Sequence, residues 1–231
     1  HVIDNISFQA FEGDFISIVG PSGCGKSTLL DILAGLMPSS SGQVFFLGEP
    51  VIKPRKEIGY MLQRDQLFEW RSILRNTLLG PEIQHSSHKD KKKARKTASE
   101  MLTRYDLGGF LGSKPSELSG GMRQRAAVIR TLIMEPTLLL LDEPFCALDN
   151  ITKNGIYKWY IEMKGKMKNS TLIITHDIDE ALILSNKIYI LSGKSGKLSK
   201  SIKVKSANNL DFFLSENFII YKKEILSMLE L

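Results

Sequence analysis

A glycine-rich segment near the start of the chain carries the residue types that bind phosphate. It matches the pattern G-x-x-x-x-G-K-[ST] and reads Gly20-Pro21-Ser22-Gly23-Cys24-Gly25-Lys26-Ser27. Glycines let backbone N–H groups approach phosphate oxygens, and the N-terminus of the helix expected after the segment adds a favourable potential. Lys26 would reach the β- and γ-phosphates of a nucleotide, and the Ser27 hydroxyl would ligate Mg²⁺. We therefore expect residues 20–28, Thr28 included, to bind a nucleotide, with Cys24 as a small loop residue rather than a catalytic thiol.

Two carboxylates end the apolar run Leu138 to Leu141. A buried strand here would deliver Asp142 to its carboxyl edge, beside the glycine-rich loop, where it could hold the Mg²⁺ shell. Glu143 would then be placed to polarise an attacking water, and general-base help of this kind is worth about 10²–10⁴-fold in rate. An acidic pair at a strand end can also cap a helix. The intact glycine-rich loop in the same chain favours the chemical interpretation.

A second candidate anion site lies far along the chain from the first. The stretch reads Leu118-Ser119-Gly120-Gly121-Met122-Arg123-Gln124-Arg125 and opens a helix with small residues and a hydroxyl.

The elements that must position these residues alternate between strands and helices. Strands are expected at 2–8, 15–19, 43–47, 57–62, 138–141, 172–175, 187–192 and 198–204, and helices at 26–36, across 82–135 and in the tail 209–231. The short apolar strands at 138–141 and 172–175 are typical of a parallel sheet buried on both faces. The tail has apolar residues at helical spacing, which favours core packing over a partner-binding face. They are Phe212, Phe213, Phe218, Ile219, Ile225, Leu226 and Leu229.

Composition excludes several classes of protein. The chain has 231 residues, 42% of them hydrophobic and 24% charged, which rules out disorder, collagen and a disulfide scaffold. Cys24 and Cys146 lack metal-ligand spacing and fit a reducing compartment. The apolar runs are far shorter than the roughly 20 residues of a transmembrane helix, and no leader opens the chain, so we expect a cytosolic protein. The net charge is +6, partly from the run Lys89 to Lys96. We interpret this run as a solvated helix face rather than a nucleic-acid site, because no aromatic residues interleave it.

With these motifs in this order, the chain resembles the ATP-binding subunits of ABC transporters over essentially its whole length, and the stretch from Leu118 resembles the signature motif of that family. The resemblance implies an α/β fold: a P-loop NTPase with a RecA-like core, an antiparallel β-subdomain and an inserted α-helical subdomain. We expect the core and β-subdomain at 1–81, the helical subdomain at 82–135, the second part of the core at 136–206 and a helical tail at 207–231. In this family the signature serine and glycines meet the ATP held by the opposite subunit, a role that falls to Ser119, Gly120 and Gly121.

The resemblance assigns roles to three more residues. Gln63 stands where the family places a glutamine that touches Mg²⁺ or the attacking water, although a lone Gln at a strand end would otherwise be a polar surface residue. His176 matches the switch histidine that donates to the γ-phosphate, although alone it would be taken for a structural histidine. Asp149, in Ala147-Leu148-Asp149, matches the aspartate that aligns the two subunits, with Cys146 in place of the usual serine. The family's adenine-stacking aromatic residue would fall upstream of His1, so weaker ATP binding is expected of this chain.

A segment after Gln63 points to a subfamily. Trp70-Arg71, in the stretch Gln63 to Ile73, and the signature region resemble importers of nitrate, sulfonate, taurine and pyrimidine precursors, although Glu69 stands where a proline is common. Trp70 could anchor docking to another protein, because Trp and Arg are enriched at binding hot spots. It could equally pack into the joint between subdomains.

The resemblance therefore implies an ATPase at the cytoplasmic face of the cell membrane, as a peripheral subunit with ATP and Mg²⁺ as cofactors. Its expected partners are a second copy of the chain, two transmembrane permease subunits and, indirectly, an extracytoplasmic substrate-binding protein, with no nucleic acid. The alternatives are a soluble ABC ATPase of DNA repair, translation or cofactor assembly, a nucleotide-binding regulator that does not hydrolyse ATP, and an exporter. Glu143 together with His176 disfavours the regulator.

Overall fold

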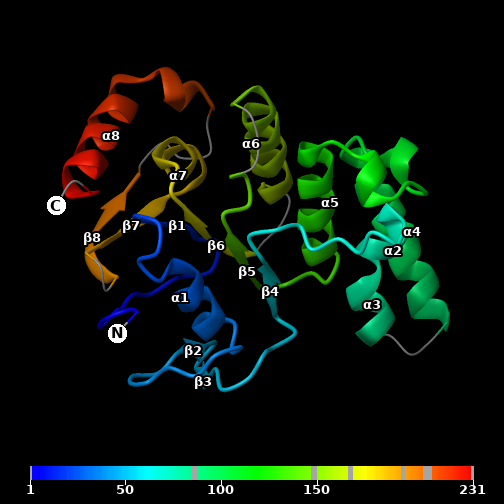
Figure 1. The fold of residues 1–231 in the computed structure, drawn as a ribbon, viewed down its shortest axis with the longest axis horizontal. Coiled ribbons are helices and arrows are strands. Elements are labelled where there is room, and N and C mark those ends of the chain that lie inside the picture. The colour runs from blue at the N-terminus through cyan, green and yellow to red at the C-terminus, as the bar shows by residue number, and fades with distance from the viewer. Residues whose placement is uncertain are drawn as a thin grey trace.

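A six-stranded sheet forms the centre of the protein (Figure 1). The computed structural model describes residues 2–84, 88–146, 150–165, 169–193, 196–204 and 210–229. The strand order is β4-β5-β6-β1-β7-β8, in which β8 alone is antiparallel to its neighbour. The strands are β1 (Phe15–Val19), β4 (Ile58–Met61), β5 (Leu138–Asp142), β6 (Ser170–Thr175), β7 (Lys187–Ser192) and β8 (Lys197–Lys203).

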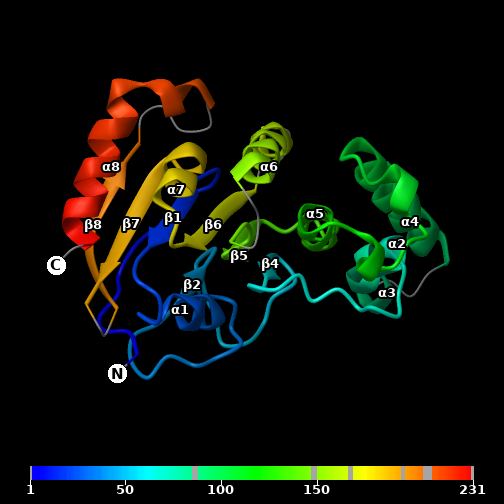
Figure 2. The same cartoon turned by 45° about the horizontal axis from the view of Figure 1, so that its top comes forward.

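Helices cover both faces of the sheet (Figure 2). On one face lies α1 (Lys26–Leu33), and on the other lie α6 (Asn150–Lys164), α7 (Ile178–Leu184) and α8 (Glu216–Leu229). Alternate residues of β1 enter two separate apolar clusters: Ile16 and Ile18 pack on the α1 side, Phe15 and Val19 on the side of α6 and α7. Both faces are therefore buried, which is why the central strands are continuously apolar.

The parallel pairing brings four strand ends to the same edge of the sheet. Gly20 follows β1, Gln63 lies just beyond β4, Glu143 follows β5 and His176 follows β6. In an open α/β sheet, ligands bind at the carboxyl ends of the strands, and this edge carries the sequence-predicted chemistry.

A small hairpin and a helical region extend this core. The hairpin joins β2 (Phe45–Phe46) to β3 (Glu49–Pro50) through Leu47 and Gly48, whose φ values of 52° and 82° fit a type I′ turn. The helical region lies beyond β4 in both views (Figures 1 and 2). It comprises α2 (Ile73–Thr77), α3 (Leu79–Gln84), α4 (His88–Arg104), the short 3₁₀ turns η1 (Gly108–Phe110) and η2 (Pro115–Glu117), and α5 (Gly120–Leu132).

The structure differs from the sequence-based expectations in three places. Residues 2–8 form no strand, because they have no ladder partner. The helices of the helical region begin at Ile73, earlier than the expected range 82–135. The tail divides into a short 3₁₀ turn η3 (Leu210–Leu214) and α8, and its apolar stripe is only half buried. Phe212, Phe218 and Ile225 lie in the core, whereas Phe213, Ile219 and Leu226 are exposed.

The charged run lies on helix α4. Residues 90–93, 95 and 96 of α4 are exposed to solvent, as the interpretation of a solvated face requires.

Within the described part of the chain, no helix is both long enough and apolar enough to span a bilayer.

A carboxyl group is buried between α6 and α7. Glu180 is 1% exposed, and the hydroxyl of Tyr157 donates to its Oε2 across 3.4 Å. Burial, with a smaller contribution from the nearby Asp177 carboxylate, raises the pKa of Glu180 to about 8 against the opposing effect of Lys153. Glu180 therefore holds a proton in the folded protein at pH values where the unfolded chain has released it.

Stability should consequently fall with rising pH through this group. The folded pKa lies above the ordinary value of 4.5, so the contribution of Glu180 is complete below that value and is lost as the pH rises towards about 8. We expect Glu180→Gln, which cannot ionise, to gain stability relative to wild type across this window in thermal unfolding. Glu162→Gln, at an exposed position of α6, is the matched control. Parallel pH profiles for wild type and Glu180→Gln would contradict the assignment.

Candidate functional site

The glycine-rich loop wraps around the ammonium group of Lys26. This side chain is 5% exposed, and its Nζ donates to the carbonyl oxygens of Gly20 and Pro21, each at 2.8 Å. Gly23 and Gly25 have φ values of 80° and 94°, which side-chain-bearing residues rarely adopt. The loop is therefore closely curved around a central cation, an arrangement that could hold phosphate.

The two carboxylates after β5 lie in different surroundings. Asp142 is 4% exposed, and its Oδ1 is a buried oxygen without a hydrogen-bond partner. Burial raises the pKa of Asp142, as does the neighbouring Glu143, while a hydrogen bond from the Ser27 hydroxyl lowers it. A buried acceptor beside a hydroxyl, with a lone pair to spare, fits the outer shell of a Mg²⁺ ion. No cluster of three or more His, Cys, Asp or Glu side chains suited to a metal lies within the described ranges. Asp142 and Ser27 therefore offer a partial ligand set, which phosphate oxygens would complete.

Two polar side chains converge on a carboxylate oxygen of a third residue, and the three residues follow three different strands. Gln63 donates from Nε2 to Oε2 of Glu143 at 3.2 Å, and Nδ1 of His176 lies 3.3 Å from the same oxygen. The Glu143 side chain is 13% exposed and that of His176 is 51% exposed, so the group opens to solvent on the histidine side. The sequence predicted all three residues, and the structure brings them together.

The backbone at Glu143 is held in an unfavourable conformation. Its φ is 44°, in the left-handed region, where a residue with a side chain costs about 1–3 kcal/mol. The N–H of Glu143 donates to the carbonyl of Ile174 at 2.9 Å, and its carbonyl accepts from the N–H of Cys146 at 3.3 Å. These bonds to β6 and to the following turn fix the side chain at the sheet edge.

The signature residues do not join this group within one chain. Ser119 caps α5, its hydroxyl accepting from the N–H of Met122 at 3.4 Å, and Ser119 and Gly120 are exposed while Gly121 is buried. Helix α5 packs on β4, whereas α1, which follows the glycine-rich loop, packs on β5. Both views place α1 and α5 on opposite sides of β4 and β5 (Figures 1 and 2). Asp149, with Ala147 and Leu148, lies outside the described residues.

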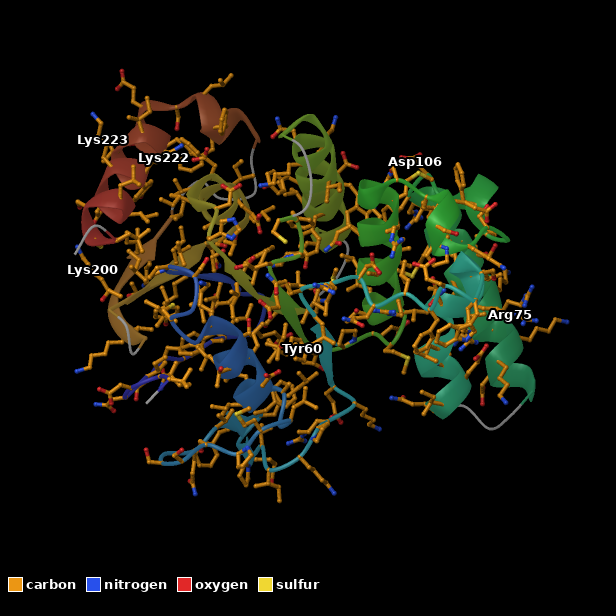
Figure 3. All side chains as sticks on the ribbon, in the orientation of Figure 1. Tyr60, Arg75, Asp106, Lys200, Lys222 and Lys223 are labelled. Carbon is orange, nitrogen blue, oxygen red and sulfur yellow. The ribbon has the colours of Figure 1, made fainter. Side chains whose placement is uncertain are left out.

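Sequence reasoning missed two contacts that position the site. The hydroxyl of Tyr60, labelled in Figure 3, donates to Oδ1 of Asp31 at 3.1 Å and ties β4 to α1. Lys153 of α6 pairs with Asp177 at 2.8 Å, and Asp177 caps the helix that starts just after His176. The acidic residue after the histidine carried a signal for a helix cap. Tyr60 and Asp31 carried none, because the residues are 29 positions apart.

Sequence comparison gives a consistent set of relatives. The family model described as "ABC transporter" matches residues 3–146. The chain is 41% identical to the aliphatic sulfonates import ATP-binding protein SsuB of Bacillus cereus, over 99% of this chain and 88% of that protein. It is 42% identical to the formylaminopyrimidine import ATP-binding protein ThiZ of Halalkalibacterium halodurans, over 84% and 74%. It is 38% identical to the taurine import ATP-binding protein TauB of Rhizobium johnstonii, over 86% and 74%.

Two solved structures of ATP-binding cassettes are similar to this chain over most of its length. The dimeric ATP-binding cassette MJ0796, in a post-hydrolysis state bound to ADP and phosphate, superposes with a TM-score of 0.76 at 29% identity, covering 89% of this chain and 91% of its own. CbiO1 of Clostridium perfringens, part of the transporter complex cbiONQ, superposes with a TM-score of 0.79 at 26% identity, covering 100% and 93%. The predicted α/β cassette fold is thereby confirmed.

Proposed function

This chain belongs to the ABC transporter family as an ATP-hydrolysing import subunit, and from that premise we propose that it drives import of a small anion or a pyrimidine precursor. The proposal of cargo rests on three relatives whose names specify sulfonates, taurine and formylaminopyrimidine. We include nitrate in this class because the segment around Trp70 resembles nitrate importers as well. A soluble ABC ATPase of DNA repair, translation or cofactor assembly is the alternative, and import subunits among the relatives disfavour it.

The convergence of Gln63 and His176 on Glu143 is the observation that carries the catalytic proposal. Glu143 acts as general base and takes a proton from the attacking water. Gln63 orients that water, and His176, which is open to solvent, donates to the γ-phosphate. Lys26 and the loop 20–28 hold the phosphates, because catalysis of phosphoryl transfer is mostly positioning and charge stabilisation.

Mg²⁺ fits the residues present. Ser27, Asp142 and Gln63 would hold it, with the unpartnered Oδ1 of Asp142 as the supporting observation. When bound, the ion would neutralise charge on the β- and γ-phosphates.

A second copy of the chain would complete the site. Ser119 and Gly120 are exposed at the start of α5, and α5 packs away from the glycine-rich loop of its own chain. Helix N-termini bind anions through free N–H groups, so Ser119, Gly120 and Gly121 of one copy would meet the ATP held by the other. The dimeric state of the cassette MJ0796 supports this arrangement. Asp149 would align the two copies.

The partner on the membrane side would be a pair of permease subunits that receive cargo from an extracytoplasmic substrate-binding protein. The chain would then bind at the cytoplasmic face of the membrane. Trp70 is 76% exposed and stacks on Phe68 with ring centroids 4.8 Å apart, so it is not packed into the joint between subdomains. An exposed Trp70 in the segment that follows Gln63 would let docking of the permease act on the catalytic group.

The general-base role predicts the behaviour of Glu143→Gln. This variant keeps the side-chain shape and the phosphate cradle but cannot accept the proton, so we expect turnover to fall by about 10²–10⁴-fold while ATP still binds. An ATP-held dimer should accumulate. Phosphate release and light scattering measure the two effects. Lys26→Ala, which loses the cation of the cradle, is the control and should form no such dimer. Turnover of Glu143→Gln at the wild-type rate would refute the assignment.

The docking role predicts a loss of affinity in Trp70→Ala. Truncation of a hot-spot aromatic costs about 2 kcal/mol or more, so the affinity for the detergent-solubilised permease should fall by at least roughly 30-fold. Phe45→Ala, at a 60% exposed position of the small hairpin, is the matched control and should bind normally. Equal affinities of Trp70→Ala and wild type would remove Trp70 from the docking surface.

The importer proposal itself is tested by isolation of the chain from its own cell. A tagged chain purified from detergent-solubilised membranes should bring a polytopic permease in stoichiometric amount. Its associated binding protein could then be screened for cargo. A set of purely soluble partners would instead favour the soluble ATPase.

A further inference from the structure

The segment after Gln63 is bound to the signature helix α5 by an arginine. Nε of Arg123 donates to Oδ2 of Asp65 at 2.9 Å, and its Nη2 lies 3.4 Å from Oδ1 of the same carboxylate. The same Nη2 pairs with Oε1 of Glu69 at 3.0 Å. Arg123 thus spans both carboxylates of the segment with one planar guanidinium group, a geometry that a lysine could not reproduce.

A second arginine of α5 holds the main chain of the same segment. Nη1 of Arg130 donates to the carbonyl of Gln66 at 2.7 Å, and Nη2 donates to the carbonyl of Asp65 at 2.6 Å. Gln66 has a φ of 48°, so the chain turns here through a left-handed conformation that an outside contact must stabilise. Arg123 and Arg130 are seven residues apart and share one face of the helix.

The far end of the segment is fixed to α2. Asn76 is fully buried, and its Oδ1 accepts from the N–H of Phe68 at 2.7 Å while its Nδ2 donates to the carbonyl of Phe68 at 3.1 Å. Residues 65–70 are therefore attached to the helical region at both ends.

Charge makes the arginine contact persistent. Burial is the largest single influence and raises the pKa of Asp65, but the hydrogen bonds from Arg123 and from the N–H of Leu67, together with the charges of Arg123 and Arg130, outweigh it, so the pKa lies below its usual value. The hydrogen bond to Asp65 likewise raises the pKa of Arg123. Both partners are charged at neutral pH, and charge-assisted hydrogen bonds of this kind are stronger than neutral ones.

The chain is held on both sides of Gln63, by the sheet on one side and by helix α5 on the other. On one side Met61 ends β4 in the core, and on the other Asp65 is fixed to α5, with one residue between Asp65 and Gln63. Gln63 itself is exposed and reaches Glu143 through a single amide donor. Its position over Glu143 is therefore set by how α5 stands relative to the sheet.

We propose that Arg123 is a positioning residue for hydrolysis: through Asp65 it makes the placement of Gln63 on Glu143 depend on the signature helix. Arg123 lies one helical turn after Ser119, so movement of Ser119 towards the ATP of a second copy would carry Gln63 with it. The inference rests on the catalytic role proposed above for Gln63 and Glu143. The motifs assigned no role to Arg123 or Asp65. A positioning role would explain why two arginines of α5 bind the segment after Gln63.

A double-mutant cycle tests the dependence. Steady-state hydrolysis is measured for the purified chain with Gln63→Ala, with Arg123→Gln and with both. We expect Arg123→Gln to lower kcat by about tenfold or more, because small misplacements of a catalytic group are costly. The KM for ATP should stay within about twofold, because the phosphate cradle is untouched. Adding Arg123→Gln to Gln63→Ala should lower kcat no further.

Variants at the partner residue separate positioning from folding. Asp65→Asn keeps the size of the side chain and can still accept from the N–H of Leu67, so it should fold and yet lose kcat as Arg123→Gln does. Asp65→Glu restores the carboxylate and should recover part of the loss. The matched control is Asp106→Asn. Asp106 pairs with Arg125 of the same helix at 3.4 Å, and Figure 3 shows it far from Tyr60 and the end of β4. This control should leave kcat unchanged, and thermal unfolding should show comparable stability for both Asn variants.

Other results would contradict either the positioning role of Arg123 or the catalytic role of Gln63. If Arg123→Gln and Asp65→Asn leave kcat unchanged, or if Arg123→Gln lowers kcat by the same factor with and without Gln63, the positioning role is wrong while the catalytic proposal stands. If Gln63→Ala alone leaves kcat unchanged, the catalytic role of Gln63 is wrong, and the inference falls with it.

Discussion

Parallel pairing of β4, β5, β6 and β1 is the constraint on which the chemistry of this protein depends. The strands are buried on both faces, so their side chains cannot do polar chemistry within the sheet. Their carboxyl ends, however, lie in register at one edge. A polar residue placed just beyond each strand therefore meets the others without any long loop. Gln63 and His176 reach one carboxylate oxygen of Glu143 in this way, from positions far apart in sequence.

The same burial creates an electrostatic demand that the protein alone does not meet. Asp142 and Glu143 are adjacent, and the first is buried with one oxygen unpartnered. Both desolvation and mutual repulsion disfavour two charges here, and the pKa of Asp142 is accordingly raised. A divalent cation would reverse this balance, because it stabilises carboxylates in a site of low dielectric. These surroundings support the proposal that a cation binds here together with phosphate.

Local motifs were predictable from sequence and long-range contacts were not. The glycine-rich loop, the strand before Asp142 and the cap at Ser119 depend on neighbours within a few residues, and the structure shows each of them. The segment 2–8 alternates like a strand but finds no partner, so periodicity alone misled. The hairpin at Leu47-Gly48 was missed because it lacks the usual Asn-Gly signal. The pair Asp65–Arg123 joins residues 58 positions apart, and no local pattern encodes such a contact.

The sheet edge and the helical region hold different parts of the candidate site. The sheet edge holds Glu143, the proposed base, and the glycine-rich loop, whereas the helical region holds Ser119 and, through Arg123 and Arg130, the chain beyond Gln63. Helix α5 packs directly on β4, while the stretch 62–64 between the strand end and the anchored turn is exposed. A shift of α5 against β4 would therefore be transmitted to Gln63 through this stretch. In the mechanism we propose, catalytic assembly would depend on the orientation of the helical region, which a second copy and a membrane partner could both influence by binding to it.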